Sequence, residues 1–327
     1  MTGPTTFGDR TITVRDVLES RGRSLQLELL TPDTQLDRVV ADADISSPGL
    51  ALAGFTERFR GGRMQAFGET EMAYLGTLDA ERRRRQLAEL FRFDMPAVFV
   101  TKGQDVPEVF LELAGASGIP VLRSALSTRE FYRRIKPYLE GALAPSTTMH
   151  GSLADVYGVG LLFTGKSGVG KSECVLDLVE RGHRLVADDL VLVSRRGNDV
   201  LIGRGHPLQR HHMEIRGIGI IDLRAMFGVR AIRQQKRIAG VVQLEHWDEG
   251  QDYTRTGLEE DSVEVLGVEL PRVTVPLNPG KNITVSSEVV GMNHLLRYAG
   301  IDSASAFDQH LKDNMREVQE YLEQDYE

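Results

Sequence analysis

Apolar and polar positions along the first 145 residues follow the spacings of short strands and helices. Val14, Val17 and Leu18 recur at helical spacing. Thr13 and Asp16 flank the start of this run and form a capping box, which predicts where the helix begins. The same spacing argument predicts the remaining elements of this half: strands over 25–30, 96–100 and 121–122, and helices through 87–91, over 106–115 and over 127–143. Strands that alternate with helices indicate an α/β domain.

The second half opens with two apolar strands, a glycine-rich turn and a helix. The strands are expected over 153–157 and 160–164, and the helix over 173–180. Residues 144–148, Ala-Pro-Ser-Thr-Thr, have the composition of a linker. We therefore expect two domains, an N-terminal α/β domain over residues 1–145 and a second domain over residues 146–327.

Length and composition fit this arrangement and exclude several classes of protein. The 327 residues carry a net charge of -8, which argues against a dedicated nucleic-acid binder. Arg82–Arg85 is the one basic run, and we interpret it as the solvated face of a helix. A single cysteine, Cys174, excludes an internal disulfide framework and a cysteine-based zinc cluster. Without a membrane-length apolar run or a signal peptide, we expect a cytoplasmic protein with no nucleic-acid or membrane partner.

The strongest motif is a match to the phosphate-binding pattern G-x-x-x-x-G-K-[ST], between a predicted strand and a predicted helix. In such a loop, backbone N–H groups converge on phosphate oxygens and the helix N-terminus adds its partial positive charge. Lys171 can reach the outer phosphates, and the hydroxyl of Ser172 suits Mg²⁺. ATP and Mg²⁺ are therefore the expected ligands of this phosphate loop, whose residues are Gly165, Lys166, Ser167, Gly168, Val169, Gly170, Lys171 and Ser172.

Two adjacent carboxylates, Asp188 and Asp189, end the next apolar strand. In P-loop enzymes an acid at this place can hold Mg²⁺ or take the proton from an attacking hydroxyl. The pair could also form the turn between two antiparallel strands, 184–187 and 190–193, and both interpretations can be true. The spacing does not say which aspartate has which role.

A third segment, residues 213–222, combines glycines with one acid and one base on the same face of an extended strand. Glu214 would suit Mg²⁺ and Arg216 would suit phosphate, but the segment could equally be an exposed hairpin. For His211 and His212, ordinary polar contacts are favoured over a metal site, because the HExxH spacing is missing. The residues of the segment are Met213, Glu214, Ile215, Arg216, Gly217, Ile218, Gly219, Ile220, Ile221 and Asp222.

Taken together, these motifs resemble one family, the bacterial HPr kinase/phosphorylases, which act on a serine of the phosphocarrier protein HPr. The resemblance covers residues 149–300 strongly and the N-terminal half weakly, and its most specific element is Glu214–Asp222. The other matching motifs are Met149–Gly151, the phosphate loop, Asp188–Asp189, Tyr253–Gly257 and Pro276–Asn282.

The resemblance implies a C-terminal P-loop domain like that of phosphoenolpyruvate carboxykinase, and a homohexamer. It implies Ser172 and Glu214 as Mg²⁺ ligands, and Asp189 as general base in phosphorylation and general acid in dephosphorylation. It also implies His150, Lys171 and Arg255 as catalytic residues, and the 213–222 segment as serving both reactions. A dephosphorylation loop is implied at Pro276, Leu277, Asn278, Pro279, Gly280 and Lys281.

The activity implied is that of a serine protein kinase/phosphorylase regulating carbon metabolism. It would phosphorylate HPr with ATP, or also with pyrophosphate, and reverse the reaction by phosphorolysis to pyrophosphate. Asn278 and Lys281 stand where the family often has arginine, so weaker dephosphorylation is expected. The alternatives are a P-loop small-molecule kinase or carboxykinase-like enzyme, and a nucleotide-gated binding module.

Overall fold

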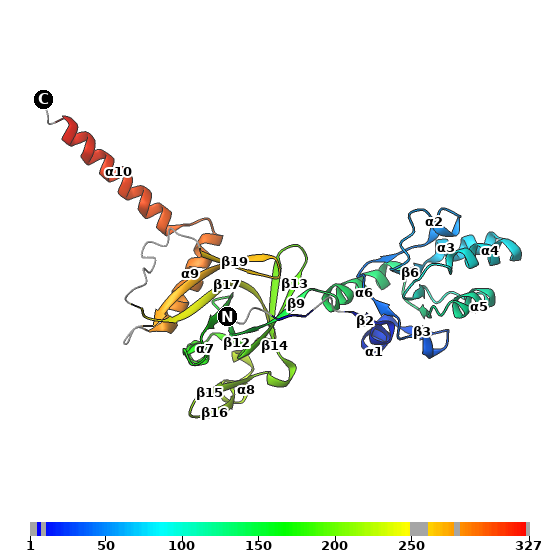
Figure 1. The fold of residues 1–327 in the computed structure, drawn as a ribbon, viewed down its shortest axis with the longest axis horizontal. Helices are drawn as coiled ribbons and strands as arrows, with labels where there is room; N and C mark the ends of the chain where they lie inside the picture. Colours follow the sequence, from blue (N-terminus) through cyan, green and yellow to red (C-terminus); the bar gives the residue numbers. More distant parts are fainter. Residues whose placement is uncertain (1–4, 8–10, 249–260, 278–281, 325–327) are drawn as a thin grey trace. The chain divides into compact units, whose positions relative to one another are not determined.

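The chain forms two α/β units, as expected from the sequence (Figure 1). The computed structural model describes residues 5–7, 11–248, 261–277 and 282–324, with side chains over 11–248, 261–277 and 282–316. One unit spans Phe7–Pro145, and the other combines Met1–Thr6 with Ser146–Glu327.

The N-terminal unit is a five-stranded sheet between two layers of helices. The strand order is β3-β8-β7-β6-β5, in which β5 to β8 run parallel and β3 is antiparallel to β8. The strands are β3 (Leu27–Leu29), β5 (Ile45–Ser46), β6 (Met64–Phe67), β7 (Val98–Val100) and β8 (Val121–Ser124), and a separate ladder joins β2 (Ile12–Thr13) to β4 (Val39–Val40). Alternate side chains of each strand enter different cores, so Phe99 faces one layer and Val98 the other.

The two helical layers are amphipathic helices that bury their apolar faces on this sheet. One layer contains α1 (Val14–Leu25) and α6 (Thr128–Ala142). The other contains α2 (Gly49–Leu52), α3 (Glu69–Thr77), α4 (Ala80–Leu90) and α5 (Glu108–Ala116), and a 3₁₀ turn, η1 (Asp33–Gln35), follows β3. The predicted capping box is confirmed, because the Thr13 hydroxyl accepts from the Asp16 N–H and the Asp16 carboxylate accepts from the Thr13 N–H.

Three local predictions need correction. Residues 144–148 are not a linker, since β9 (Ser146–His150) is a strand whose Thr147 is only 3% exposed. The strand predicted over 25–30 is shorter because α1 continues to Leu25. In the Arg82–Arg85 run, Arg83 is half-buried and donates to the carbonyls of the preceding helix end, whereas the other three are exposed as expected.

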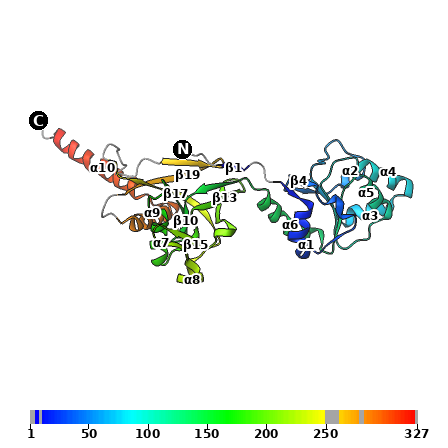
Figure 2. The same ribbon diagram turned by 60° about the horizontal axis from the view of Figure 1, so that its bottom comes forward.

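The C-terminal unit is built on a large mixed sheet, of which Figure 2 labels β1, β10, β13, β17 and β19. The strand order is β1-β9-β13-β14-β17-β11-β10-β12, extended from β17 by β19 and β18. Within it β11, β17 and β19 are parallel, so their carboxyl ends lie together. Besides β9, the strands are β1 (Thr5–Phe7), β10 (Ser152–Val156), β11 (Val159–Gly165), β12 (Arg184–Ala187), β13 (Leu190–Arg196), β14 (Val200–Gly205), β17 (Gln235–His246), β18 (Asp261–Val265) and β19 (Val268–Leu277).

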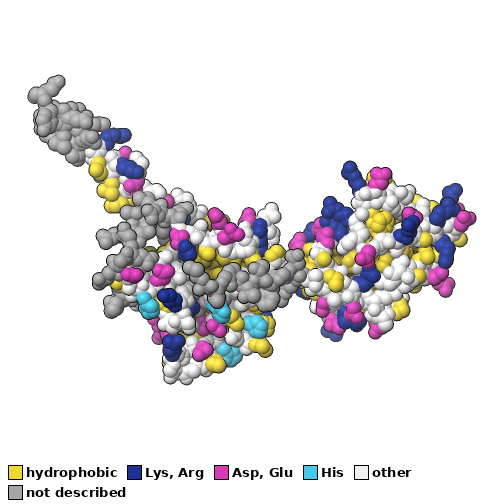
Figure 3. Space-filling model, viewed as in Figure 1, with side chains coloured by type: hydrophobic (Ala, Val, Ile, Leu, Met, Phe, Trp, Pro, Cys, Tyr) yellow, Lys and Arg dark blue, Asp and Glu magenta, His cyan; other side chains and the backbone are white. Residues whose placement is uncertain are grey.

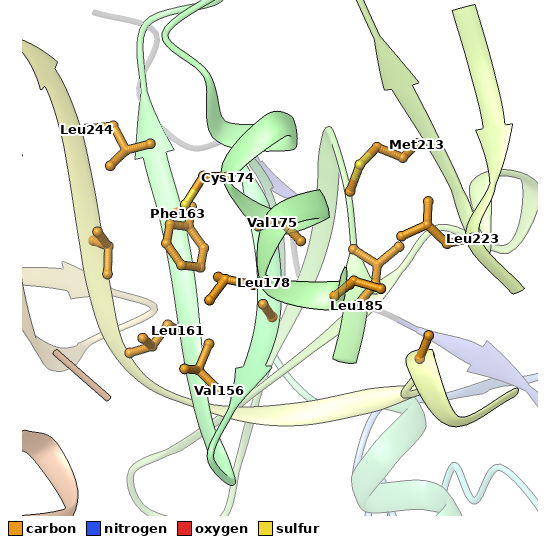
Figure 4. Packing of buried hydrophobic residues seen from close by; sticks show 14 of the residues in the cluster. Val156, Leu161, Phe163, Cys174, Val175, Leu178, Leu185, Met213, Leu223 and Leu244 are labelled. Carbon is orange, nitrogen blue, oxygen red and sulfur yellow. The ribbon is translucent and has the colours of Figure 1, made fainter. Parts of the chain in front are cut away.

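The core of this unit lies where α7 (Lys171–Glu180) packs on β10, β11 and β17. Figure 4 shows Phe163 of β11 next to Cys174 and Leu178 of the helix. Helix α9 (Ile283–Tyr298) packs against α7, β11 and β19. The remaining elements are η2 (Pro207–Gln209), the hairpin β15 (His212–Ile215) and β16 (Gly219–Asp222), α8 (Leu223–Phe227), η3 (Val229–Ala231) and α10 (Ser303–Gln324).

Helix α10 leaves an apolar face exposed. Phe307, Leu311 and Met315 recur every four residues and are 64%, 44% and 70% exposed (Figure 3). Even so, no helix in the described part of the chain has the length and apolarity that crossing a bilayer requires.

An ion pair between a buried carboxylate and a half-exposed guanidinium joins the end of α7 to α9. The Glu288 carboxylate, 8% exposed, accepts two hydrogen bonds from Arg181, at 2.9 and 2.6 Å, and lies 3.0 Å from His183 Nε2. The Arg181 guanidinium is the main reason that the pKa of Glu288 falls to about 2. Because this pKa lies below its ordinary value of 4.5, the charged form stabilises the folded state at neutral pH.

Replacing Glu288 by glutamine should therefore lower the free energy of unfolding at pH 7 by about 2 kcal/mol. The difference from wild type should be constant above pH ~4.5 and shrink as the pH falls toward the folded pKa of about 2. Urea unfolding at pH 7, 5 and 3.5 measures it. Glu89→Gln, in an exposed pair with Arg92, is the control and should change stability little. A pH-independent effect of Glu288→Gln would contradict the electrostatic explanation.

Candidate active site

The phosphate loop connects the carboxyl end of β11 to the first turn of α7. Gly165, Gly168 and Gly170 have φ angles of 140°, 78° and 97°, which residues with a side chain rarely adopt. Val169 is buried in the core under the loop and anchors it. The loop backbone can therefore turn its N–H groups toward one point beyond the sheet, as phosphate binding requires.

Lys171, the first residue of α7, lies across this loop. Its Nζ donates to the carbonyl oxygens of Gly165 and Lys166, both at 3.1 Å. The ammonium group is thus held within the loop by two neutral acceptors and by no carboxylate that the structure describes. Its charge remains available to an anionic ligand.

Asp188 is the buried member of the acid pair. It is 6% exposed and receives the Ser172 hydroxyl at 3.0 Å from both carboxylate oxygens, and the Ser152 hydroxyl at 2.5 Å from Oδ1. Burial raises the pKa of Asp188, and the two hydroxyl donors oppose that shift. This carboxylate is therefore directly linked to the hydroxyl that the motif assigns to Mg²⁺.

Asp189 differs from its neighbour in every respect. It is exposed and has a φ of 62°, and its carbonyl oxygen accepts from the N–H of Gly151 at 3.0 Å. Asp189 does not turn the chain between two paired strands, because β12 pairs with β10 whereas β13 pairs with β9 and β14. The turn interpretation is therefore wrong: the chain leaves one ladder and enters another at this point. A carboxylate at such a crossover is open to solvent.

His150 lies beside the acid pair. It is the last residue of β9, where it is paired with Leu190, the residue after Asp189. Its side chain is exposed. The exposed acid and this imidazole thus come from neighbouring strand ends.

The 213–222 segment forms a hairpin whose base is buried and whose tip is exposed, as one of its two interpretations expected. Met213 and Ile215 belong to the core, whereas Ile218 and Ile220 are 76% and 75% exposed. Arg216 reaches the phosphate loop: a Cβ on Gly168 would lie 2.7 Å from its Nη1. The hairpin thereby brings a guanidinium against the loop.

The remaining predicted residues have no described contact with the phosphate loop or the acid pair. Glu214 pairs with Ile220 in the hairpin ladder, and its exposed side chain makes no hydrogen bond or ion pair with another described residue. Pro276 and Leu277 end β19 and pair with Glu245 and His246 of β17. Arg255 and Asn278–Lys281 lie outside the described residues. His212 Nδ1 lies 2.9 Å from the carbonyl of Arg210, an ordinary polar contact as expected.

Sequence reasoning missed two polar residues of the site. Ser152 contacts Asp188, and Gln243 accepts from Thr164 Oγ1 at 2.6 Å directly before the loop. Gln243 interrupts the apolar run 238–244 in the middle of β17, which was the only signal in the sequence. Ser152 gave none, because its partner is 36 residues away.

The donor set can be compared with the requirements of Mg²⁺. The described residues contain no cluster of three His, Cys, Asp or Glu side chains, so no all-protein cage is present among them. The Ser172 hydroxyl backed by a buried carboxylate does fit, since Mg²⁺ at phosphate sites uses one or two protein oxygens together with phosphates and water.

Comparison with known proteins adds a family to this geometry. Residues 12–139 match the family described as HPr Serine kinase N terminus, and residues 141–311 match HPr Serine kinase C-terminal domain. An HPr kinase/phosphorylase of Chloroherpeton thalassium is 45% identical over 93% of this chain and 92% of its own length. One from Bacillus mycoides is 42% identical over 92% of this chain and 96% of its own. The solved Hpr(Ser) kinase/phosphatase from Coxiella burnetii is 32% identical, covering 49% of this chain and 97% of its own, with a TM-score of 0.44.

Proposed function

The chain belongs to the HPr kinase/phosphorylase family, and on that premise we propose that it phosphorylates a serine of HPr with ATP and reverses this by phosphorolysis. The observation that carries the proposal is the linked set of phosphate loop, Ser172 and buried Asp188, with exposed Asp189 beside it. Phosphoryl transfer needs mainly positioning and charge stabilisation, and these residues can supply both.

The loop N–H groups would hold the outer phosphates, with Lys171 and Arg216 supplying positive charge. Ser172, positioned by Asp188, would hold Mg²⁺, with Glu214 as a further ligand from the hairpin. When bound, the metal would neutralise charge on the β- and γ-phosphates. His150 and Arg255 would complete the site around the transferred group.

Asp189 would manage the proton of the substrate serine. In the forward direction the serine oxygen would attack the γ-phosphorus of ATP, and Asp189 would take the hydroxyl proton. The bond between the γ-phosphorus and the bridging oxygen would break, and ADP would leave. In reverse, an oxygen of inorganic phosphate attacks the phosphoserine phosphorus, Asp189 returns the proton to the serine oxygen, and pyrophosphate leaves. The exposure of Asp189 suits this, because a protein substrate must reach it from solvent.

Further features belong to the same proposal. The Pro276–Lys281 loop would serve chiefly the reverse reaction, and pyrophosphate could replace ATP in the forward one. The catalytic unit would share the phosphoenolpyruvate carboxykinase type of P-loop fold and assemble as a homohexamer. We place the protein in the cytoplasm, where it would regulate carbon metabolism through HPr, with residues 1–145 in a regulatory or assembly role.

The test is incubation of the protein with γ-labelled ATP, Mg²⁺ and HPr. We expect label on one serine of HPr, none on an HPr variant with alanine at that serine, and loss of label as pyrophosphate when inorganic phosphate is added. Label only on a small molecule would instead favour a small-molecule kinase. Nucleotide binding without transfer to any acceptor would favour a nucleotide-gated binding module.

A further inference from the structure

Two residues at the junction of β9 and β10 donate hydrogen bonds to the two members of the acid pair. The N–H of Gly151 donates to the carbonyl of Asp189, and the hydroxyl of Ser152 donates to Asp188 Oδ1. Position 151 requires glycine, because a Cβ there would overlap the carbonyl oxygen of Phe163. Two successive residues thus hold two successive aspartates, one through the backbone and one through a side chain.

Ser152 is built into the sheet rather than placed on its surface. It is 1% exposed and pairs in register with Phe163 of β11, the strand that leads into the phosphate loop. The β10–β11 ladder therefore holds both the Ser152 hydroxyl and the start of the phosphate loop in place. The 2.5 Å separation from Asp188 is typical of a hydroxyl donating to a carboxylate.

From this geometry we infer that Ser152 is a positioning residue for the magnesium site, acting through Asp188; the inference rests on the proposed function. Asp188 Oδ1 accepts from both serine hydroxyls, whereas of these two hydroxyls only that of Ser172 donates to Oδ2. Ser152 thus fixes the rotation of the carboxylate plane. Asp188 in turn directs the lone pairs of the Ser172 oxygen, because a hydroxyl that donates to a carboxylate presents its lone pairs on the other side.

Without the Ser152 hydroxyl, the buried carboxylate would keep Ser172 as its only side-chain donor and could rotate with it. Outer contacts that orient ligands typically change metal affinity by about 10- to 100-fold, and a second support is retained here. We therefore expect Ser152→Ala to lower the affinity for Mg²⁺ about 10-fold. Binding of ATP without metal depends on the loop and Lys171, and it should stay within about twofold of wild type.

The experiment is calorimetric titration of the full chain with ATP in EDTA, and with Mg²⁺ at saturating ATP. Ser152→Ala and Ser152→Cys are compared, because cysteine keeps the volume but is a weak donor. The matched control is Ser124→Ala in the N-terminal unit, which removes another fully buried hydroxyl, bonded at 2.6 Å to the carbonyl of Leu25. Thermal unfolding of all variants accompanies the titrations.

Weaker Mg²⁺ binding in both Ser152 variants, with unchanged metal-free ATP binding and an unaffected control, supports the inference. Equal losses with and without Mg²⁺, or a cysteine variant like wild type, would overturn it and leave Ser152 a packing residue. The proposed function is contradicted by a different result, in which the wild-type protein binds ATP and Mg²⁺ but transfers no phosphate to HPr.

Discussion

Replacing Lys171 by alanine is expected to lower phosphoryl transfer to HPr, and its reversal, by at least about 100-fold. The ammonium is the charge held inside the phosphate loop, and removing one preorganised group from a developing charge costs about 10²- to 10³-fold. The protein should remain folded, because Lys171 is only half-buried and its partners are two loop carbonyls. Single-turnover transfer from labelled ATP and thermal unfolding measure the two effects.

Lys312→Ala is the matched control for this charge. Lys312 lies on α10 and makes an exposed i,i+4 pair with Asp308. The variant should therefore transfer phosphate like wild type. An unchanged turnover in Lys171→Ala would falsify the assignment of the loop to the transferred phosphates.

Replacing Asp189 by asparagine should slow transfer about 100-fold or more while ATP and Mg²⁺ bind as in wild type. Proton transfer by a positioned carboxylate contributes about 10²- to 10⁴-fold. Asparagine is also compatible with the left-handed backbone at this position, so the local structure should survive. Turnover at saturating substrate concentrations measures the loss of transfer, and nucleotide affinity is measured separately to show that binding is retained.

Asp188→Asn is the contrasting variant. Its amide keeps one acceptor oxygen where two hydroxyls donate to the wild-type carboxylate, so the support of Ser172 is weakened. We expect Asp188→Asn to need more Mg²⁺, so that excess Mg²⁺ partly restores its rate of phosphoryl transfer. Excess Mg²⁺ should not restore the rate of Asp189→Asn. Rescue of Asp189→Asn by Mg²⁺, with Asp188→Asn insensitive to it, would reverse the two roles.

The sequence predicted those parts of the molecule that short-range patterns determine. The capping box at Thr13, the strand before Gly165 and the helix after it all depend on neighbours within a few residues. The phosphate loop was visible for the same reason, since glycines with positive φ and one lysine form a continuous motif. Membership of the family, inferred from the order of such motifs, is confirmed by matches over both halves of the chain.

Contacts between distant segments could not be predicted. The difference between Asp188 and Asp189 comes from strand pairing, which buries one side chain and exposes the other, and neither pattern nor charge distinguishes them. Residues 144–148 resembled a linker because Pro145 and small polar residues dominate. Residues 146–148 belong to a strand only because β13 is available for pairing, with Ser146 opposite Ser194 and Thr148 opposite Leu192. Ser152 and Gln243 joined the site in the same way.

The position of β1 has a practical consequence for anyone expressing the C-terminal unit alone. This strand, Thr5–Phe7, neighbours β9 in the sheet of the C-terminal unit, so the N-terminal unit is inserted within a single continuous fold. A fragment that starts at Ser146 would lack that strand and expose an open row of backbone N–H and C=O groups along β9. Unpaired rows of this kind recruit other chains and cause aggregation. A better-behaved fragment would join the first seven residues to Ser146 through a short flexible connector.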